Sequence, residues 1–356
     1  MNKIKTQIIS ITDIGLVREV NEDSCSTAET PNGIVCVVCD GMGGHVGGAE
    51  ASHIAVNCVI QYLGKEVYPD IKQALKDALD FANLQIIGTA SENSDLRGMG
   101  TTACVLLVQD NSVWLAHAGD SRVYLYVAKE KRLRRLTKDH SYVQGLIDQG
   151  IIYEEEAENH PNKNRILKAL GIKKDLQPDI PERPVLPAQG DIFLICSDGL
   201  SNMVPDREIE KILAENSDLK GKESELMSAA KSAGGLDNIT FQLVRVSHSP
   251  HKKSIFESKD YAQFKREEMK IFRYKNVILL AVVAIVSILA GIWVGRNTTE
   301  KTEQTPVIQT KSENSMEEET VSKTDTTQIN PEKQDETKYE TKDTIELSEK
   351  TNNEEI

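Results

Sequence analysis

Residues 34–40 read IVCVVCD, an apolar run that ends in an aspartate, and the glycine-rich sequence GMGG follows it directly. Such a run has the length and the β-branched content of a buried strand, and it delivers its aspartate into a loop. Two further segments repeat the pattern: WLAHAGD (114–120), followed by SR, and IFLICSD (192–198), followed by GL. One such aspartate alone is more often part of a turn than a ligand, but the repetition predicts a common site for three of them: Asp40, Asp120 and Asp198.

A fourth aspartate, Asp237, stands before Asn238 and the apolar run ITFQLV (239–244). Carboxylates that converge from several strand ends, with few Lys or Arg residues beside them, repel one another unless a cation lies between them. Oxygen ligands of this kind suit Mg²⁺ or Mn²⁺ rather than a metal that prefers thiolates. The pattern therefore predicts a site for divalent cations.

The segment REVNED (18–23) places one guanidinium, that of Arg18, close in the chain to two more carboxylates, Glu22 and Asp23. A guanidinium binds phosphate through two parallel hydrogen bonds, so Arg18 is a candidate phosphate ligand. A surface cluster of ion pairs is the alternative for this segment taken alone. The segment GMGTT (98–102) opens a further strand with small residues and is a weak signal by itself.

The first 247 residues alternate short apolar runs with turns and amphipathic stretches, which is enough chain for one large core. Strands are predicted at 6–11, 34–39, 102–108, 113–117, 123–127, 133–136, 192–196 and 239–246, and the turn QDNS (109–112) predicts a hairpin. Apolar residues at helical spacing predict helices at 51–63, 71–86, 209–213 and 226–233. Because hairpins and grouped helices replace strict strand–helix alternation, the predicted fold class is α+β with mainly antiparallel sheets.

The last part of the chain differs in composition from the rest. From Arg296 to Ile356 it holds 8 Lys and Arg against 16 Asp and Glu, and one aromatic residue, Tyr339. Such a segment buries too little apolar surface to offset its ordering entropy, so a disordered tail is predicted. The tail carries −8 of the net charge of −13. A net charge of this sign argues against nucleic acid as the main partner, because binding to a phosphate backbone needs clustered Lys and Arg.

The six cysteines show no framework of regular spacings, and several lie inside strand-like runs, as is typical of a reducing compartment. Cys36 and Cys39 form a lone C-x-x-C, a spacing that zinc and redox sites also use. In an extended strand, positions three apart point to opposite faces, and no second pair completes a tetrahedral site. The prediction is therefore two buried strand residues.

Between Lys275 and Arg296 the chain has no charged residue, and NVILLAVVAIVSILAGIWVG (276–295) is long enough to cross a bilayer as a helix. A buried core helix is the alternative, but the segment is apolar on all faces and carries Trp293 near one end. Residues 248–275 hold 8 Lys and Arg against 4 Asp and Glu. By the positive-inside rule, the N-terminal region is expected in the cytoplasm and the acidic tail outside the cell. The start, MNKIKTQIIS, lacks the apolar run of a signal peptide.

Six short motifs follow one another along the chain: R-x-x-x-E-D (18–23), DGMGGH (40–45), GTT (100–102), GDSR (119–122), SDGL (197–200) and DN (237–238). In this order and spacing the chain resembles the PPM family, the metal-dependent type-2C protein phosphatases, in its bacterial form, over essentially all of residues 5–247. The segment 137–171 resembles the flap of the bacterial branch, and an ordinary helical insertion is the alternative. The resemblance implies a central sandwich of two antiparallel β-sheets flanked by helices, in α-β-β-α layers, with the metal site at one end.

The resemblance also implies which residues hold metal. Asp40 would bridge two Mn²⁺ or Mg²⁺ ions, and the carbonyl of Gly41 would bind one of them. Asp198 and Asp237 would hold the other ion. Asn238, the second residue of the DN motif, is counted with the metal site.

Four more roles follow from the same resemblance. Glu22 and Asp23 would support the site directly or through water, and Asp120 would contribute to a more labile third ion. Arg18 would hold the substrate phosphate. The predicted catalytic residues are Arg18, Asp40, Asp198 and Asp237.

Two divalent ions about 4 Å apart lower the pKa of a shared water and stabilise charge as it attacks phosphorus, so no protein nucleophile is required. Met42 stands where eukaryotic relatives often have a histidine, which leaves the group that protonates the leaving oxygen open. His45 lies in the same loop, where a structural or solvated role is the alternative to that of an acid.

The predicted function is hydrolysis of phosphoserine and phosphothreonine in proteins by a membrane-anchored enzyme, with an opposing Ser/Thr kinase as partner by family analogy. A catalytically silent phosphopeptide-binding module is one alternative, ordinarily marked by a lost metal carboxylate. A metal-dependent hydrolase of another phosphoester is the second, and a nuclease would need a basic groove. The predicted parts are a phosphatase domain (1–247), a basic linker (248–275), a transmembrane helix (276–295) and an acidic extracytoplasmic tail (296–356).

Overall fold

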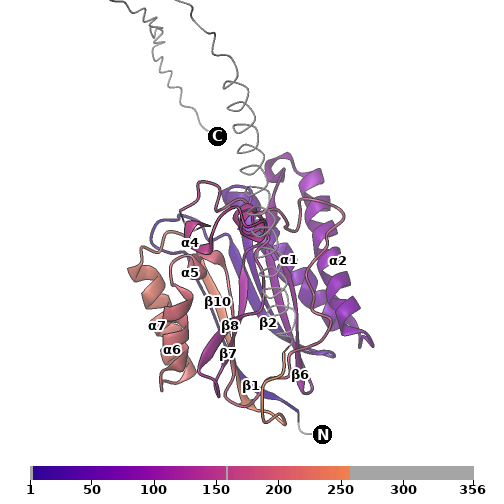
Figure 1. Ribbon diagram of the computed structural model, residues 1–356. Helices are drawn as coiled ribbons and strands as arrows, with labels where there is room; N and C mark the ends of the chain where they lie inside the picture. The colour runs from indigo at the N-terminus through magenta and orange to yellow at the C-terminus, as the bar shows by residue number, and fades with distance from the viewer. Residues whose placement is uncertain (1–2, 158, 257–356) are drawn as a thin grey trace, which may run out of the picture. The chain divides into compact units, whose positions relative to one another are not determined.

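Two antiparallel β-sheets lie face to face at the centre of the protein (Figure 1). The computed structural model describes residues 3–157 and 159–256. One sheet has the order β1-β10-β9-β7-β8: β1 (Lys5–Asp13), β10 (Ile239–His248), β9 (Ile192–Cys196), β7 (Arg122–Val127) and β8 (Arg132–Arg135). The other has the order β2-β3-β5-β6, with β4 paired to β3: β2 (Asp23–Thr30), β3 (Gly33–Met42), β4 (Gly100–Thr101), β5 (Ala103–Gln109) and β6 (Ser112–Ala118).

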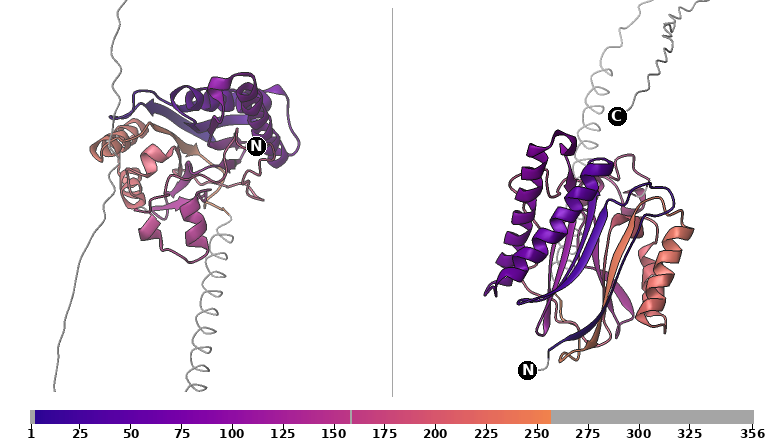
Figure 2. Two further views of the ribbon diagram at one scale, coloured as in Figure 1. Left: turned by 90° about the horizontal axis from the view of Figure 1, so that it is seen from above. Right: turned by 180° about the vertical axis from the view of Figure 1, so that it is seen from behind.

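Helices cover the outer face of each sheet, so the layers follow the order α-β-β-α (Figure 2). Helices α1 (His45–Lys65) and α2 (Ile71–Glu92) pack on the sheet that contains β3. Helices α6 (Asp206–Ala214) and α7 (Leu219–Ser232) pack on the sheet that contains β10. The connections contain short elements: η1 (Ser94–Leu96), α3 (Tyr142–Asp148), α4 (Glu154–Ala157) and α5 (Asp198–Ser201). The predicted α+β class, with two antiparallel sheets flanked by helices, is confirmed for the described residues.

Strand β3 shows how the strand-end pattern produces this core. Val35, Val37 and Cys39 face the helical layer, whereas Cys36 and Val38 face the other sheet. Because both faces are covered, the strand needs no polar alternation and reads as a continuous apolar run. The prediction that Cys36 and Cys39 lie on opposite faces is confirmed, and both thiols are free.

Strand β2 is not predicted from the sequence, because DSCSTAET is mostly polar. In the structure the strand is half exposed. It pairs with β3 along its whole length, from Asp23 opposite Asp40 to Thr30 opposite Gly33, and forms one edge of its sheet. An edge strand with a solvent-facing side requires no apolar run, so it lacks the pattern that marks buried strands. The pairing places Asp23 level with Asp40, which matters for the site described below.

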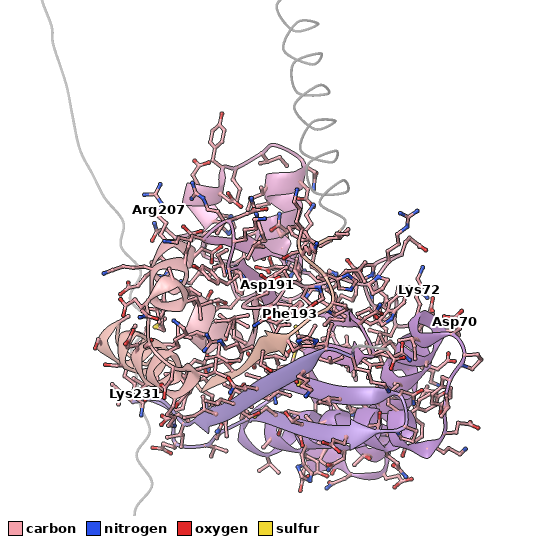
Figure 3. The ribbon with its side chains drawn as sticks, turned by 90° about the horizontal axis from the view of Figure 1, so that it is seen from below. Asp70, Lys72, Asp191, Phe193, Arg207 and Lys231 are labelled. Carbon is pink, nitrogen blue, oxygen red and sulfur yellow. The ribbon has the colours of Figure 1, made fainter. Side chains whose placement is uncertain are left out.

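The predicted hairpin between β5 and β6 is confirmed. Gln109 lies opposite Ser112, and Asp110 adopts a φ of 48°, a left-handed conformation that aspartate tolerates better than most residues. The predicted helices are present and extend further than their apolar repeats. Asp70, which accepts a hydrogen bond from the backbone N–H of Gln73, sets the start of α2 (Figure 3).

The chain continues to contact the domain after β10. Ile255 forms a backbone bridge with Leu186, the Ser249 hydroxyl donates to the Pro187 carbonyl (2.6 Å), and Phe256 packs against the core between the sheets. The predicted domain boundary at residue 247 therefore precedes the last segment that packs on the sandwich.

The rest of the predicted linker (to residue 275), the predicted transmembrane helix (276–295) and the predicted tail (296–356) lie outside the described residues. Within residues 3–157 and 159–256, no helix combines the length and the apolar content needed to cross a membrane.

We expect Phe193→Ala to lower the free energy of unfolding by about 3–5 kcal/mol, because it removes a fully buried ring and leaves a cavity. Phe193 lies in the core between the two sheets. Figure 3 labels it inside the domain, in contrast to Arg207, whose side chain points outward from the surface. Urea denaturation of both proteins measures the difference. The control, Val67→Ala, changes a side chain that is 69% exposed and should stay within about 0.5 kcal/mol of wild type. Equal stabilities of the two variants would contradict the assignment of the core.

Candidate metal and phosphate site

Aspartates from three strand ends meet at one end of the sandwich. Asp40 lies near the end of β3, Asp120 follows β6, and Asp198 follows β9 at the start of α5. Burial raises the pKa of Asp40 well above its usual value, and three neighbouring carboxylates raise it further: Asp23, Asp198 and Asp120. Burial raises the pKa of Asp198, and the charge of Asp237, which precedes β10, raises it further. The structure thus brings together the four aspartates that the sequence pattern singled out.

These carboxyl groups lie too close together to be ionised at once without a cation. Burial, together with the charges of Asp198 and Asp237, raises the pKa of Asp23 to about 8. Burial and the charge of Asp198 also raise the pKa of Asp120 to about 8. The charge of Asp198 raises the pKa of Asp40 as well, so these carboxyl groups disfavour one another's ionisation. A cluster of carboxylates of this kind stabilises a bound cation.

The residues at this end fit divalent cations. Two covered carboxylate oxygens, Glu22 Oε1 and Asp120 Oδ1, have no hydrogen-bond donor among the described residues. Covered carboxylate oxygens without a donor cost free energy, and a bound cation offsets that cost. Asp23, in contrast, is buried and accepts a hydrogen bond from the Ser197 hydroxyl (2.8 Å). The site therefore offers a set of carboxylate oxygens, the donors that Mg²⁺ and Mn²⁺ prefer.

The Asp-Gly steps are places where two backbones approach closely. A methyl group on Gly41 would come within 2.1 Å of the Gly48 carbonyl oxygen. One on Gly199 would come within 1.9 Å of the Asn238 carbonyl oxygen. Because no side chain fits there, only glycine lets these loops close over the aspartates. Gly41, after Asp40, and Gly199, after Asp198, therefore allow the close approach that the site needs as well as the turn.

Arg18 lies beside the carboxylates at this end. Its guanidinium donates to Asp237 Oδ2 at 2.8 Å and lies 3.8 Å from Glu22 Oε2. Although burial acts in the opposite direction, the bond with Asp237 raises the pKa of Arg18, so the group stays charged. The guanidinium is partly exposed, and a ligand at the cluster can reach it from solvent.

The side chain of Asn238 has a task other than metal binding. Its amide oxygen accepts the backbone N–H of Glu22 (2.8 Å), and its amide nitrogen donates to the carbonyls of Ile14 and Val20 (both 3.0 Å). The residue is buried, and both polar atoms have partners. Asn238 therefore joins the two loops that flank the cluster, and its place in the metal site stays a prediction.

Hydroxyl groups that the sequence pattern marks only weakly hold the backbone of Asp40. The Thr102 hydroxyl accepts the N–H of Asp40 (2.9 Å) and shares a hydrogen bond with the Ser121 hydroxyl (2.7 Å). The Thr101 hydroxyl donates to the carbonyl of Asp40 (2.8 Å). The GTT motif (100–102) carries the signal, but its role depends on the pairing of β4 with β3, which the sequence does not reveal.

Arg122, the arginine of the GDSR motif, forms an ion pair with Asp139, which is not one of the four strand-end aspartates. Its Nη2 donates to Asp139 Oδ2 at 2.7 Å, and its Nε approaches both oxygens of the same carboxylate at 3.1 and 3.2 Å. Although burial raises it, the Arg122 charge lowers the pKa of Asp139 overall. Sequence analysis does not identify this pair, because no spacing rule links residues 17 positions apart.

Met42 is the last residue of β3 and pairs with Gly100 of β4, so the loop before α1 starts from a fixed strand end. His45 is the first residue of α1. The side chain of His45 lies outside the described part of the chain.

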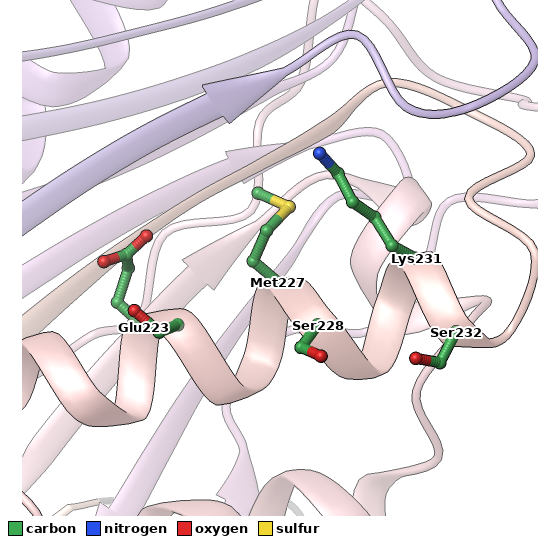
Figure 4. A pocket seen from close by; sticks show the side chains of 6 residues that line it. Glu223, Met227, Ser228, Lys231 and Ser232 are labelled. Atoms are coloured by element: carbon green, nitrogen blue, oxygen red, sulfur yellow. The ribbon is translucent and has the colours of Figure 1, made fainter.

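Two surface hollows do not include the strand-end aspartates. One, of about 530 Å³, runs along α7, where Glu223, Met227 and Lys231 line it (Figure 4). Its lysine, Lys231, is bound to Asp13 of β1 at 2.7 Å. The other, of about 510 Å³, lies beside α3. Strand-end aspartates line neither hollow, so the candidate site is defined by its carboxylates rather than by a deep cavity.

Comparison with known proteins agrees with this geometry. Residues 17–231, more than half of the chain, match the sequence profile of protein phosphatase 2C. The chain belongs to the protein phosphatase 2C family. The serine/threonine phosphatase stp of Listeria welshimeri is 40% identical over 240 residues, which cover 65% of this chain and 93% of that protein.

Solved structures of protein phosphatase 2C enzymes match the described domain. The S. agalactiae serine/threonine phosphatase gives a TM-score of 0.64 at 32% identity, covering 68% of this chain and 100% of that one. The catalytic domain of the phosphatase PstP, solved in complex with 2 manganese ions, gives 0.60 at 32% identity, covering 68% of this chain and 98% of its own. The chain is therefore a serine/threonine protein phosphatase of bacterial type, from a family that uses divalent metals. The predicted family and enzyme class are confirmed.

We expect the metal-free phosphatase to lose stability as the pH rises from about 6.5 to about 8. In the folded protein, Asp23 and Asp120 keep their protons up to about pH 8, whereas the ordinary aspartate value is 3.8. The unfolded chain therefore binds fewer protons in this window, and the free energy of unfolding falls with pH. Burial lowers the pKa of His117 to about 3. Below about pH 6.5, this histidine therefore makes the free energy of unfolding rise with pH, opposite to the effect of the two aspartates.

Urea unfolding in EDTA at several pH values measures this dependence. Added Mn²⁺ should flatten it, because metal ligands must already be deprotonated. Asp120→Asn should make the metal-free dependence shallower, whereas Asp110→Asn, at the hairpin turn, should not. A metal-free stability that rises across this window would show that the carboxylates are not coupled as described.

Proposed function

We propose that this phosphatase hydrolyses phosphoserine and phosphothreonine esters of proteins at the acidic end of its sandwich, with two Mn²⁺ or Mg²⁺ ions and a more labile third. One observation carries the proposal: Asp40 and Asp198 lie together among further carboxylates that raise one another's pKa, and the guanidinium of Arg18 lies beside Asp237 and Glu22 of the same cluster. Cations neutralise such a cluster, and a phosphate ester is then attracted both to them and to the guanidinium.

The proposed metal ligands follow the motif positions and the contacts described above. Asp40, the carbonyl of Gly41, Asp198 and Asp237 would hold two ions. Glu22 and Asp23 would support them, and Asp120 would serve the labile third. When bound, such ions supply Lewis-acid chemistry, because they make water a stronger nucleophile at neutral pH and neutralise charge on the phosphoryl group.

Arg18 is the group that this chain offers to the phosphate. It lies at the exposed side of the cluster, held by Asp237 and Glu22. In that position it binds a phosphate oxygen pair and orients the ester for in-line attack. The guanidinium of Arg18 also pairs with Asp237, a proposed metal ligand. The proposed phosphate site and the proposed metal site therefore lie next to each other.

The cysteines offer no thiol nucleophile within the described residues. Burial raises the pKa of Cys25 to about 11 and that of Cys36 and Cys196 to about 12. Burial also raises the pKa of the other thiols: Cys39, Cys58 and Cys104. The thiolate is the reactive form, and these thiols stay protonated near neutral pH. Water is therefore the proposed nucleophile.

We further propose that the phosphatase is anchored in the cell membrane by residues 276–295, with its catalytic domain in the cytoplasm. The support is the uncharged apolar run and the basic excess in residues 248–275. The substrates would then be cytoplasmic phosphoproteins, and a Ser/Thr protein kinase would act in opposition.

We expect Asp40→Asn, Asp198→Asn and Asp237→Asn to lower Mn²⁺-dependent turnover of phosphoserine and phosphothreonine peptides by about 100-fold or more. Each change keeps the side-chain volume but removes a charge that a cation needs, and losses of this order are typical when transition-state stabilisation is removed. Steady-state assays of the full-length protein with and without Mn²⁺ measure the effect.

The matched control is Asp110→Asn, which makes the same chemical change at an exposed turn and should leave turnover unchanged. Near wild-type turnover of any one cluster variant would remove that residue from the metal site. Activity that does not respond to Mn²⁺ or Mg²⁺ would contradict the proposed chemistry. A preference for a nucleotide or nucleic acid ester would place the enzyme in another class.

The membrane proposal is tested in intact cells with a tag at each end of the chain. Externally added protease should remove a tag after Ile356 and leave the N-terminal tag and the catalytic domain protected, because positive flanks remain in the cytoplasm. Western blots against both tags give the result. Digestion of the N-terminal tag alone would show the opposite orientation, and protection of both tags would show that the chain does not cross the membrane.

A further inference from the structure

Two histidines and an aspartate converge next to the acidic cluster but do not belong to it. One ligand atom from each of His117, His140 and Asp179 lies within 4.8 Å of the others. His117 is buried in β6 and its ring nitrogens have no partner among the described residues. The His140 ring packs on it, with centroids 4.5 Å apart. Such a group has the composition of a transition-metal site.

The hydrogen bonds of His140 decide against a metal ion. The backbone N–H of Gly119 donates to His140 Nδ1 at 3.1 Å, so this nitrogen carries a lone pair. In the neutral ring the proton must then sit on Nε2, which lies 3.1 Å from Asp179 Oδ2. A protonated ring nitrogen cannot bind a metal ion. The cluster is therefore a relay of contacts from Asp179 through His140 to Gly119: Nε2 faces the Asp179 carboxylate at 3.1 Å without hydrogen-bond geometry, and Nδ1 accepts the Gly119 N–H.

The relay ends on the residue before Asp120. His140 holds Gly119 twice, because its own backbone N–H donates to the Gly119 carbonyl at 2.8 Å while its ring accepts the Gly119 N–H. Gly119 has a φ of 117°, and a methyl group there would come within 2.6 Å of Thr102. The turn that carries Asp120 is thus held from two sides: the Ser121 hydroxyl bonds to Thr102 after Asp120, and His140 holds Gly119 before it.

The other end of the relay is fixed to the body of the domain. Asp179 exchanges two backbone hydrogen bonds with His117 of β6 (2.9 and 2.8 Å), and its Oδ1 accepts from Lys168 Nζ at 2.7 Å. The backbone N–H of Leu167 donates to the His140 carbonyl at 2.7 Å. The ring of His140 is therefore held on both sides, and its tautomer follows from these contacts.

We propose that His140 is a positioning residue for the phosphatase reaction: its Nδ1 holds the Gly119 N–H and so orients Asp120 toward the acidic cluster, while Asp179 keeps the proton on Nε2. Nδ1 accepts the Gly119 N–H and Nε2 is buried against the Asp179 carboxylate, so His140 does not itself reach substrate. The proposal deepens the proposed function, because it assumes that Asp120 serves the more labile metal ion. Supporting groups of this kind commonly change metal affinity 10- to 100-fold.

Two substitutions separate the two ring nitrogens. In His140→Asn the side-chain oxygen takes the place of Nδ1 and keeps an acceptor for the Gly119 N–H. In His140→Gln the amide nitrogen takes the place of Nε2, which keeps the donor to Asp179 and removes the acceptor. Asp175→Asn, a nearby change at a residue bound to Gln177, is the matched control.

The first readout does not require turnover or metal. Hydrogen exchange in the metal-free, full-length protein, followed by mass spectrometry of peptides that cover residues 118–122, reports on the Gly119 N–H. We expect exchange in these peptides to be about 5-fold faster in His140→Gln, as the loss of one hydrogen bond implies, and near wild type in His140→Asn. Equal exchange in the two variants would overturn the proposal.

The second readout is calorimetric titration with Mn²⁺. We expect His140→Gln to weaken the weakest binding step about 10-fold and to leave the tighter steps unchanged, with His140→Asn close to wild type. Weakening of all steps alike, in a variant with unchanged melting temperature, would show general damage and overturn the proposal.

If His140→Gln does not fold, Asp179→Asn carries the test, because the Asp179 carboxylate is more than half exposed and tolerates replacement. It should weaken the same binding step in part, and no change would overturn the proposal. A wild-type protein without Mn²⁺-dependent activity would contradict the proposed function, whereas the exchange experiment would still decide the role of His140.

Discussion

Repulsion between carboxylates shapes one end of this protein. Asp40, Asp120 and Asp198 come from three strands and approach so closely that the charges of Asp198 and Asp120 raise the pKa of Asp40. Charges in a partly desolvated site interact strongly, and each added carboxylate raises the pKa of its neighbours. The arrangement therefore costs free energy in the metal-free chain and becomes favourable when cations are present. The rest of the structure keeps these groups in place against that repulsion.

The rigid part of the structure is the packed sandwich. Strand β3 is buried on both faces, between the helices and the second sheet, so the position of Asp40 follows from the position of the core. Close packing resists small displacements, which suits a site in which oxygen atoms must converge on ions. Polar groups complete this control at the strand ends. The hydroxyls of Thr101 and Thr102 hold the Asp40 backbone, and the Asn238 amide joins the loops on either side.

The proposed role of His140 extends the same principle to Asp120. This aspartate follows Gly119, beyond the last residue of β6, and one of its oxygens has no hydrogen-bond donor in the part of the chain that the structure describes. A ligand of that kind needs support from a second layer, and the Asp179–His140–Gly119 relay provides it through the backbone. The difference between a ligand fixed by a strand and one fixed by a relay offers a physical reason why one metal ion would be more labile than the others.

The sequence alone predicted the buried strands, the helices, the α+β class and the four aspartates, because each of these leaves a local pattern. A buried strand must be apolar along its whole length, and an aspartate that follows it is visible at once, as in IVCVVCD (34–40). The short motifs then sufficed to name the family. Strand β2 left no such pattern, since an edge strand needs no apolar run. Only the tertiary structure decided how the strand ends converge, that Arg122 pairs with Asp139, and that Asn238 joins the loops on either side of the cluster. These contacts join residues far apart in the chain, and their geometry depends on the packing of two sheets, which no local spacing encodes.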